Sequence, residues 1–383
     1  MTTAPGAPDR PDRADWSDWT DAENDRVRAL GRWRAPHDFD AAGPAGTRDG
    51  RAVVSFASND YLGLTVHPAV VAAAHAALDR WGAGAGSARL IVGSRPVHSE
   101  LEAALADWRG TEAAALFPTG FAANLGVLTT FGGPGVLICS DALNHASIID
   151  GARMAHADVT VFHHADADHI DRLLAEAPDR RAVVVTDTVF SMDGDVAPLA
   201  ALAEVCRRRG ALLVLDEAHA VLGPDPGDAL AGVDALRVGT LSKTLGSLGG
   251  FVAGPRRFVD LIVNRARSYI FTTAPPPSVA AAALAALGVV RSAEGDALRA
   301  RLRASVERVA PGHPSPIVPV VIGDEAATVA AADRLLEHGL LVPAIRPPTV
   351  APGTSRLRVA LSAAHTDDQV ARLVAALAEV APR

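Results

Sequence analysis

The sequence alternates short apolar runs with longer helical stretches, and this alternation constrains the fold more than any other feature. The runs are continuously apolar, which is typical of strands covered on both faces of a sheet. The stretches between them, such as 199–209 (LAALAEVCRRR), have helical periodicity and end in basic residues that suit the negative end of a helix. We predict an α/β fold with a mostly parallel, doubly wound, seven-stranded sheet. The predicted strands are 113–117, 136–139, 159–162, 182–186, 211–215, 236–240 and 250–253.

The C-terminal part of the chain has a different pattern. Residues 240–250 are too few for a crossover helix, so the strand at 250–253 is predicted to run antiparallel. Three prolines at 275–277 precede alanine-rich helix, and two strand candidates follow at 317–322 and 356–361, which predicts a smaller α+β domain. The predicted divisions are an N-terminal tail and helical segment at 1–55, a large domain at 56–283 and a small C-terminal domain at 284–383.

Composition excludes several classes of protein. The net charge of −8 provides no basic footprint, so no nucleic-acid partner is expected. The apolar stretches are interrupted well short of the length of a membrane span. The first fifteen or so residues lack the apolar core of a signal peptide, and their composition predicts a disordered tail. A solvated helix is expected from about Thr20 to Trp33, and Cys139 and Cys206 are expected to be buried free thiols. We therefore expect a cytoplasmic protein that does not bind membranes.

An acidic string, LLVLDEAHAVLG at 212–223, admits two interpretations. Nucleotide-driven helicases use Asp-Glu-Ala-His to hold Mg²⁺, but they also need a phosphate loop, GxxxxGK[ST], upstream of it. The chain has none. The related string GTLSKTLGSLGG at 239–250 lies downstream and has Ser242 before its lysine. This order argues against a nucleotide-driven enzyme.

The second interpretation is a pyridoxal phosphate site. This cofactor needs a lysine for its Schiff base and a carboxylate for its pyridinium nitrogen. Asp216 directly follows the predicted strand 211–215, and Lys243 follows 236–240. Carboxyl ends of strands are where an open α/β sheet forms its ligand crevice. Asp216 alone could be a helix cap, but the two residues in this order predict the cofactor site.

Several strings together resemble the α-oxoamine synthase family of fold-type I pyridoxal phosphate enzymes. Taken singly some are weak, but their order along nearly all of the chain is specific. They are SNDYLGL (58–64), TGFAAN (119–124), NHASIIDG (144–151), VFSMDGD (189–195), LDEAHAVLG (215–223), TLSKTLGSLGG (240–250) and IRPPTV (345–350).

The resemblance implies roles for cofactor-binding residues. Lys243 is implied to carry the cofactor and to move the Cα proton, Asp216 to pair with the pyridinium nitrogen, His219 to bind the phenolic oxygen and His145 to stack on the ring. Gly120 and Phe121 open a helix after a strand, where backbone N–H groups favour a phosphate, although a plain turn would use the same residues. Further implied contacts are Ser191 and Thr240, with Thr272 and Thr273 donated by the neighbouring subunit of a homodimer.

The resemblance also implies a substrate side. Arg356 and Arg358 lie on one face of a predicted strand, a pattern that is usually a solvated surface. By resemblance, however, Arg358 binds the amino acid's carboxylate, assisted by Asn59. Arg32 and Thr349 match substrate-contacting positions less securely.

The implied reaction is a decarboxylative condensation of L-alanine with a pimeloyl thioester of CoA or of an acyl carrier protein. Two alternatives remain at this stage. A sibling activity would use glycine or serine with another acyl thioester. A non-catalytic protein of the same fold would have lost the lysine or the aspartate, and both are present.

Two further strings need interpretation. FHHADADHID at 162–171 has metal-ligand residue types, but its spacing matches no tight metal motif, and Asp166 or Asp168 suits a helix N-cap. No metal is expected. In GAGAGSARLIVGS at 82–94, Ser87-Ala88 stand where the family usually has Gly-Ser, which places the local loop geometry and the fit of the substrate in question.

Overall fold

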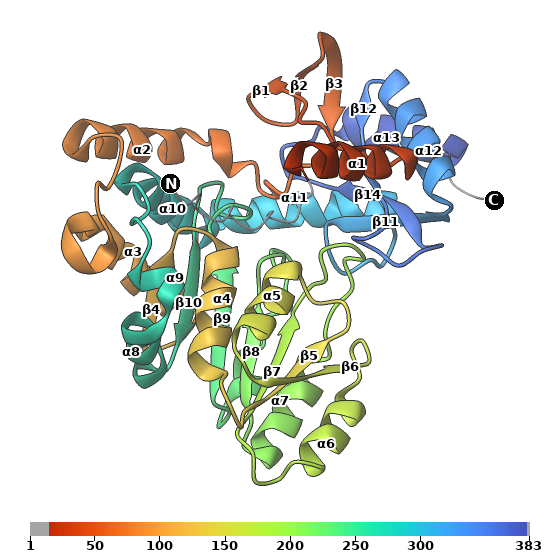
Figure 1. Ribbon diagram of the computed structural model, residues 1–383. Coiled ribbons are helices and arrows are strands. Elements are labelled where there is room, and N and C mark those ends of the chain that lie inside the picture. Colours follow the sequence, from red (N-terminus) through yellow and green to blue (C-terminus); the bar gives the residue numbers. More distant parts are fainter. Residues whose placement is uncertain (1–14, 381–383) are drawn as a thin grey trace, which may run out of the picture.

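A seven-stranded mixed sheet forms the centre of the large domain in this computed structural model, which describes residues 15–380 (Figure 1). Six strands are mutually parallel and β10 runs antiparallel to both of its neighbours, β4 and β9. Both the seven strands and the antiparallel β10 confirm the predictions. In sheet order the strands are β4 (Ala113–Phe117), β10 (Gly250–Gly254), β9 (Ala235–Thr240), β8 (Leu212–Asp216), β7 (Ala182–Asp187), β5 (Leu137–Asp141) and β6 (Asp158–Phe162).

Helices cover both faces of this sheet, as the continuously apolar strands require. Alternate residues of β7 show the division, because Val183 and Val185 pack in one buried cluster and Val184 packs in another. The first cluster includes α4 (Gly120–Phe131), α5 (Ala146–Met154), α8 (Arg256–Arg265) and α9 (Arg267–Ile270). The second includes α6 (Ala167–Ala175) and α7 (Leu199–Arg209). Near β4 and β10 a third cluster adds α2 (Pro68–Trp81), α3 (Pro96–Trp108) and α10 (Pro277–Val290).

Two small sheets lie above the large one in Figure 1. The predicted strands near 317–322 and 356–361 are antiparallel neighbours, β11 (Ile317–Gly323) and β14 (Ser355–Ala360), and β13 (Ala344–Ile345) extends their sheet. In the other sheet, parallel pairing of β3 with β12 joins the N-terminal segment to the C-terminal part of the chain. Its strands are β1 (Phe39–Ala41), β2 (Ala45–Arg48), β3 (Arg51–Ser55) and β12 (Leu340–Leu341). The helices here are α11 (Ala293–Val309), α12 (Glu325–Glu337) and α13 (Asp367–Val380). The exact domain boundaries stay a prediction.

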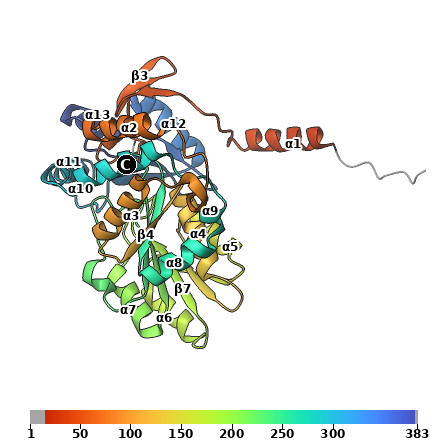
Figure 2. The same cartoon turned by 90° about the vertical axis from the view of Figure 1, so that its left-hand side faces the viewer.

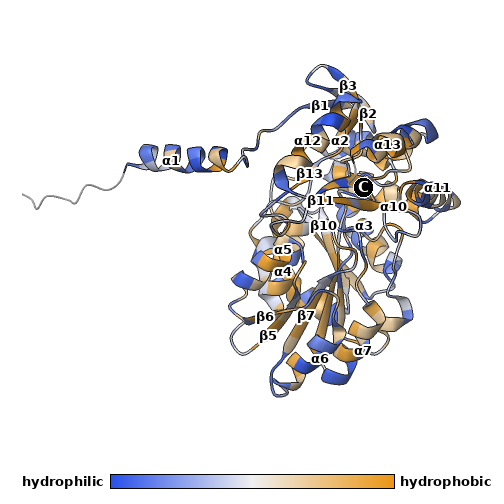
Figure 3. Ribbon diagram, turned by 90° about the vertical axis from the view of Figure 1, so that its right-hand side faces the viewer, coloured by the Kyte–Doolittle hydropathy of each residue, from blue (hydrophilic) through white to orange (hydrophobic). Residues whose placement is uncertain are grey.

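Helix α1 (Trp16–Ala29) extends away from the rest of the chain (Figure 2). It begins at the N-cap Asp15, whose side chain accepts from Ser17 N, and none of its residues is buried. Figure 3 shows it as mostly hydrophilic, whereas the strands of the large sheet are hydrophobic. The tail predicted for the first fifteen or so residues lies almost entirely outside the described residues.

Within residues 15–380, no single helix is long and apolar enough to cross a membrane. Only α10 and α11 taken together meet the length and composition required, and their axes differ by 78°.

Candidate active site

A cavity of about 210 Å³ opens where the parallel strands of the large sheet end. Its walls come from segments that directly follow β4, β5, β7, β8 and β9, so the site lies in the crevice expected for an open α/β sheet. Seven predicted residues line it: Gly120, Phe121, His145, Asp216, His219, Thr240 and Lys243. The sequence did not single out Thr119, Asn124, Ser147, Asp187, Ala218, Gly239 and Ser242, which also line it.

Lys243 is the only lysine in the 383-residue sequence. Its Nζ lies 2.8 Å from Nε2 of His219. Burial lowers the pKa of Lys243, and the negative charges of Asp216 and Asp187 offset part of that shift. A lysine with a depressed pKa can supply a neutral amine, the form that acts as a nucleophile and as a base.

His219 is held on its other side by Tyr61. Nδ1 of His219 lies 2.6 Å from Tyr61 Oη, and that hydroxyl donates to Asn59 Oδ1 at 3.1 Å. With this proton arrangement, Tyr61 accepts from Nδ1–H, which leaves the Nε2 lone pair directed at Lys243. Burial lowers the pKa of His219 well below its usual value, and the charge of Lys243 adds to the effect. The neutral imidazole is therefore the form that this site favours.

Asp216 ends β8 and is held by two donors. Asn124 Nδ2 donates to its Oδ2 at 2.7 Å, and the backbone N–H of Ala218 donates to its Oδ1 at 2.9 Å. The same Asn124 amide nitrogen donates to Ser147 Oγ at 2.9 Å. Asn124 occurs in the quoted string TGFAAN and Ser147 occurs in NHASIIDG, so these strings were the available sequence signal for the two residues.

Asp187 places a second buried carboxyl beside the first, because it pairs with Asp216 in the register of β7 and β8. Burial and the charge of Asp216 raise the pKa of Asp187 well above its usual value. Its Oδ2 accepts from the backbone N–H of His145 at 2.8 Å. The signal for Asp187 was the same as for Asp216, namely an apolar strand that ends in aspartate.

The ring of His145 is fixed from its own helix. His145 is the N-cap residue of α5, and its Nδ1 accepts from Ser147 N at 3.2 Å and lies 2.8 Å from Ser147 Oγ. Burial lowers the pKa of His145, and the nearby Asp216 offsets part of that shift. An uncharged ring held in this way suits stacking on an aromatic cofactor.

The N-terminus of α4 forms another part of the cavity wall. Thr119 caps the helix, and its Oγ1 accepts from Ala122 N at 3.0 Å. A Cβ placed on Gly120 would lie 3.4 Å from Thr240 Cβ, which is an ordinary van der Waals contact, so the start of α4 lies directly beside the end of β9. Backbone N–H groups at a helix start favour a phosphate group.

Arg358 on β14 is buried, so this strand face is not the solvated surface that the pattern usually forms, and the role of Arg358 toward a carboxylate stays a prediction. Its Nε donates to the carbonyl of Ser191 at 2.5 Å, and its Nη2 donates to Asn59 Oδ1 at 3.1 Å. Arg356 is also buried and pairs with Asp193. A hydrogen-bond chain therefore runs from Lys243 through His219, Tyr61 and Asn59 to Arg358.

Besides Asn59 and Arg358, five predicted residues do not line the 210 Å³ cavity. Ser191 contacts Arg358 through its backbone carbonyl. Arg32 pairs with Glu325 at 2.9 Å, and with Thr349 it lines a separate cavity of about 1020 Å³. Thr272 and Thr273 do not line the cavity within the described chain, and Thr273 forms an isolated antiparallel bridge with Ala88. Their predicted roles stay predictions.

The two strings set aside earlier have simple structural accounts. Asp166 is the N-cap of α6, as predicted, and its side chain accepts from His169 N at 2.8 Å. His163, Asp166 and His169 do bring three potential metal-ligand atoms within 4.8 Å of one another. His169 Nδ1 is already engaged with His163 N. Neither Ser87 nor Ala88 has a positive φ, so their backbone conformations do not require glycine.

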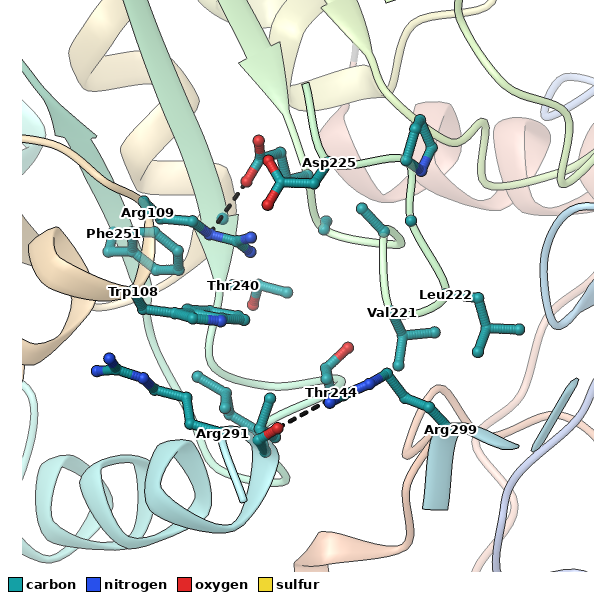
Figure 4. Close-up of a pocket in the computed structure, with 18 residues that line it drawn as sticks. Trp108, Arg109, Val221, Leu222, Asp225, Thr240, Thr244, Phe251, Arg291 and Arg299 are labelled. Carbon is teal, nitrogen blue, oxygen red and sulfur yellow. Dashed lines mark hydrogen bonds and ion pairs between the residues drawn. The ribbon is translucent and has the colours of Figure 1, made fainter. Parts of the chain in front are cut away.

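A further cavity, of about 470 Å³, shares Ala218, Gly239 and Thr240 with the candidate site (Figure 4). In its wall the guanidinium of Arg109 lies over the ring of Trp108, and its Nε is 3.1 Å from Glu217 Oε2. Glu217 also accepts from Arg237 Nε at 2.6 Å. Glu217, the residue that follows Asp216, is thus paired with the buried Arg237 and the mostly buried Arg109.

The donor set fits pyridoxal phosphate. Asp216 offers a buried carboxylate to a pyridinium N–H, Lys243 offers an amine, His145 offers a ring face, and the glycine-lined start of α4 offers N–H groups to a phosphate. Asp187 and Asp216, two adjacent buried carboxyl groups at the ends of β7 and β8, favour the binding of a positively charged group beside them.

Comparisons with known proteins agree with this fit. Residues 51–377 match the family model for aminotransferase class I and II. The serine palmitoyltransferase of Sphingomonas wittichii superposes with a TM-score of 0.88 at 32% identity, covering 96% of this chain and 100% of that one. Another serine palmitoyltransferase structure, with pyridoxal phosphate, superposes with a TM-score of 0.87 at 31% identity, covering 95% of this chain and 98% of that one. The chain thus belongs to the class I and II aminotransferase family of pyridoxal phosphate-dependent enzymes.

The curated relatives narrow the assignment. The 8-amino-7-oxononanoate synthase of Anaeromyxobacter dehalogenans is 51% identical over 361 residues, covering 89% of this chain and 90% of the relative. That of Burkholderia mallei is 49% identical over 358 residues, covering 88% and 91%. Within its family the chain belongs to the 8-amino-7-oxononanoate synthases.

Proposed function

We propose that the chain condenses L-alanine with a pimeloyl thioester to give 8-amino-7-oxononanoate, CO₂ and the free thiol, a step of biotin synthesis. The alanine Cα forms a bond to the acyl carbon, the C–S bond breaks and the thiol leaves with a proton. The bond from Cα to the carboxylate then breaks, and Cα takes a proton. The observation that carries the proposal is the constellation of the half-buried Lys243 with the buried His219 and Asp216, in a chain about half identical to synthases of this name.

Pyridoxal phosphate, when bound, supplies an electron sink for the carbanion at the alanine Cα. Asp216 would hold the ring nitrogen protonated, and His145 would fix the plane of the ring. Lys243 would take the Cα proton, since its depressed pKa makes the neutral amine accessible. His219, held by Tyr61, would orient Lys243 and the phenolic oxygen.

Arg358 would receive the carboxylate of alanine. Asn59 and the Ser191 carbonyl fix two of its nitrogens, which leaves the guanidinium oriented for a charge-assisted contact. Arg32 and Thr349 would contact the acyl portion from the 1020 Å³ cavity.

The proposed assembly is a homodimer in which Thr272 and Thr273 of each chain reach the phosphate in the other subunit. Its support is that the two threonines lie outside the cavity of their own chain, next to a strongly exposed Phe271. Either CoA or an acyl carrier protein would present the pimeloyl group.

Thiol release from pimeloyl-CoA, with L-alanine, glycine or L-serine supplied separately, tests the proposal. Release with L-alanine alone supports it. Because the superposed structures include serine palmitoyltransferases, L-serine with palmitoyl-CoA is the matched alternative. Release only in that pair would assign a sibling activity, and release in none of the mixtures would overturn the proposed donor.

A further inference from the structure

His164, which follows β6, lies between two carboxylates from different segments. Its Nδ1 is 2.9 Å from Asp141 Oδ1, and its Nε2 is 2.7 Å from Asp195 Oδ2. The ring also packs edge-on against Phe190, with centroids 4.3 Å apart. The side chain is 28% exposed, so this is a partly buried contact rather than a loose surface pair.

Both ring nitrogens of His164 face acceptors. Asp141 also accepts from Leu143 N and Ala165 N, so its carboxylate is fully engaged as an acceptor. Burial alone would lower the pKa of His164, but the hydrogen bonds to Asp141 and Asp195 raise it above the usual value. An imidazolium that donates from both nitrogens satisfies the two carboxylates together.

Asp195 connects this ring to the substrate side of the site. It closes a turn in which Phe190 N donates to the Asp195 carbonyl at 3.0 Å and Gly194 N donates to the Phe190 carbonyl at 2.8 Å. Within this turn, the Ser191 carbonyl accepts from Arg358. The contact with His164 thus fixes one end of the turn that holds the guanidinium.

A second contact strengthens the same connection. Asp193, in the same turn, pairs with Arg356, the neighbour of Arg358 on one face of β14. The turn therefore contacts both Arg356 and Arg358, and through Asp195 it also contacts His164.

We propose that His164 is a positioning residue for the amino-acid substrate, holding the 190–195 turn so that the Ser191 carbonyl fixes Arg358 for the substrate carboxylate. The inference rests on the proposed function, in which Arg358 receives that carboxylate. His164 also lines the 1020 Å³ cavity proposed for the acyl portion, but its proposed role toward the amino acid acts through the turn and needs no contact with the amino acid or the cofactor. The expected effect is on binding of a carboxylate-bearing substrate and not on the cofactor.

The variants are chosen to separate this role from a merely structural one. His164→Phe keeps a ring against Phe190 and removes both donors, and Asp195→Ala removes the acceptor while keeping the backbone of the turn. The matched control is His163→Phe, the same change one residue earlier at a side chain that is 78% exposed. Each protein is loaded with pyridoxal phosphate and titrated with L-alanine while the cofactor absorbance is followed.

Both variants are expected to weaken L-alanine binding by about tenfold, with no further loss in the double variant, because they break one contact. Cofactor affinity and the spectrum without substrate should match those of the native protein. Ethylamine, which is alanine without its carboxylate, should bind native protein and variants equally.

Three results would count against the inference. Unchanged L-alanine affinity in both variants, with only a lower melting temperature, would reduce His164 to a structural residue. An equal loss for ethylamine would remove Arg358 from the explanation. If native protein gave no response to L-alanine, the proposed function itself would fail. If His164→Phe did not fold, the Asp195→Ala result alone would decide.

Discussion

Nζ of Lys243 and Nε2 of His219 lie 2.8 Å apart at the ends of two neighbouring strands, β9 and β8. This contact joins the residue implied to carry the cofactor to the hydrogen-bond chain that ends at Arg358. The cofactor side and the substrate side of the site are therefore parts of one network.

Reduction with borohydride in the presence of pyridoxal phosphate should attach the cofactor to Lys243. Because the chain has no other lysine, peptide mass needs only to separate a label on Lys243 from one on the N-terminal amine. Lys243→Ala should remove the label and lower thiol release by at least about a thousandfold, since both the nucleophile and the proton carrier are lost. A label that persists in Lys243→Ala would contradict the assignment.

Tyr61→Phe should lower both the free energy of unfolding and the turnover rate, although the aromatic ring stays in place. The change removes the hydroxyl from both His219 Nδ1 and Asn59 Oδ1. Asn59 Oδ1 keeps its donor Arg358 Nη2, but the buried His219 Nδ1 is left unsatisfied, which costs about 1–3 kcal/mol. Urea unfolding and steady-state turnover should both report the loss. The other tyrosine of the chain provides the control. Tyr269 packs against Phe117, neither residue lines the cavity, and Tyr269→Phe should leave turnover unaltered.

The sequence predicted most of the large domain because its signals are local. Each of the seven apolar runs is a strand, and the predicted helix 199–209 matches α7. Strand ends identified Asp216 and Lys243 for the same reason. The short strands β1, β2, β3 and β12 were not predicted, because their residues are only partly apolar and their pairing joins segments almost 300 residues apart.

The remaining parts of the site depend on contacts that no local pattern encodes. Tyr61 and His219 meet across 158 positions of sequence, and Arg358 and Asn59 meet across 299. The alternation on β14 indicated that Arg356 and Arg358 share a face, but only the position of the turn at 190–195 shows that this face is buried.

Glu217→Gln should destabilise the fold far more than its conservative character suggests. Glu217 is 1% exposed and neutralises both Arg109 and Arg237, so its loss leaves buried positive charge, at a cost of about 3–5 kcal/mol. Asp225→Asn is the matched control, because Asp225 pairs with the same Arg237 but is 67% exposed and should cost no more than about 1 kcal/mol. Similar unfolding free energies for the two variants would contradict the buried-cluster account.

The pH dependence of stability should report the charge on His164. Its pKa is raised in the folded protein, so the stabilisation is fully present below the usual histidine pKa and is lost as the pH rises through the folded-state value. The difference in unfolding free energy between native protein and His164→Phe should therefore shrink as the pH rises above the usual histidine pKa of about 6.5. A difference that grows with pH would contradict the assigned charge.

Hybrid dimers can test whether Thr272 and Thr273 act across the subunit interface. One chain carries Lys243→Ala and the other carries Thr272→Ala with Thr273→Ala, and two affinity tags isolate the mixed dimer. If the threonines serve the partner's site, the lysine of the second chain meets the intact threonines of the first, so one of the two sites is complete. The hybrid should then show about half of the native activity, although each parent dimer is strongly impaired. If the threonines serve their own chain, neither site is complete, and the hybrid should be no more active than the threonine variant.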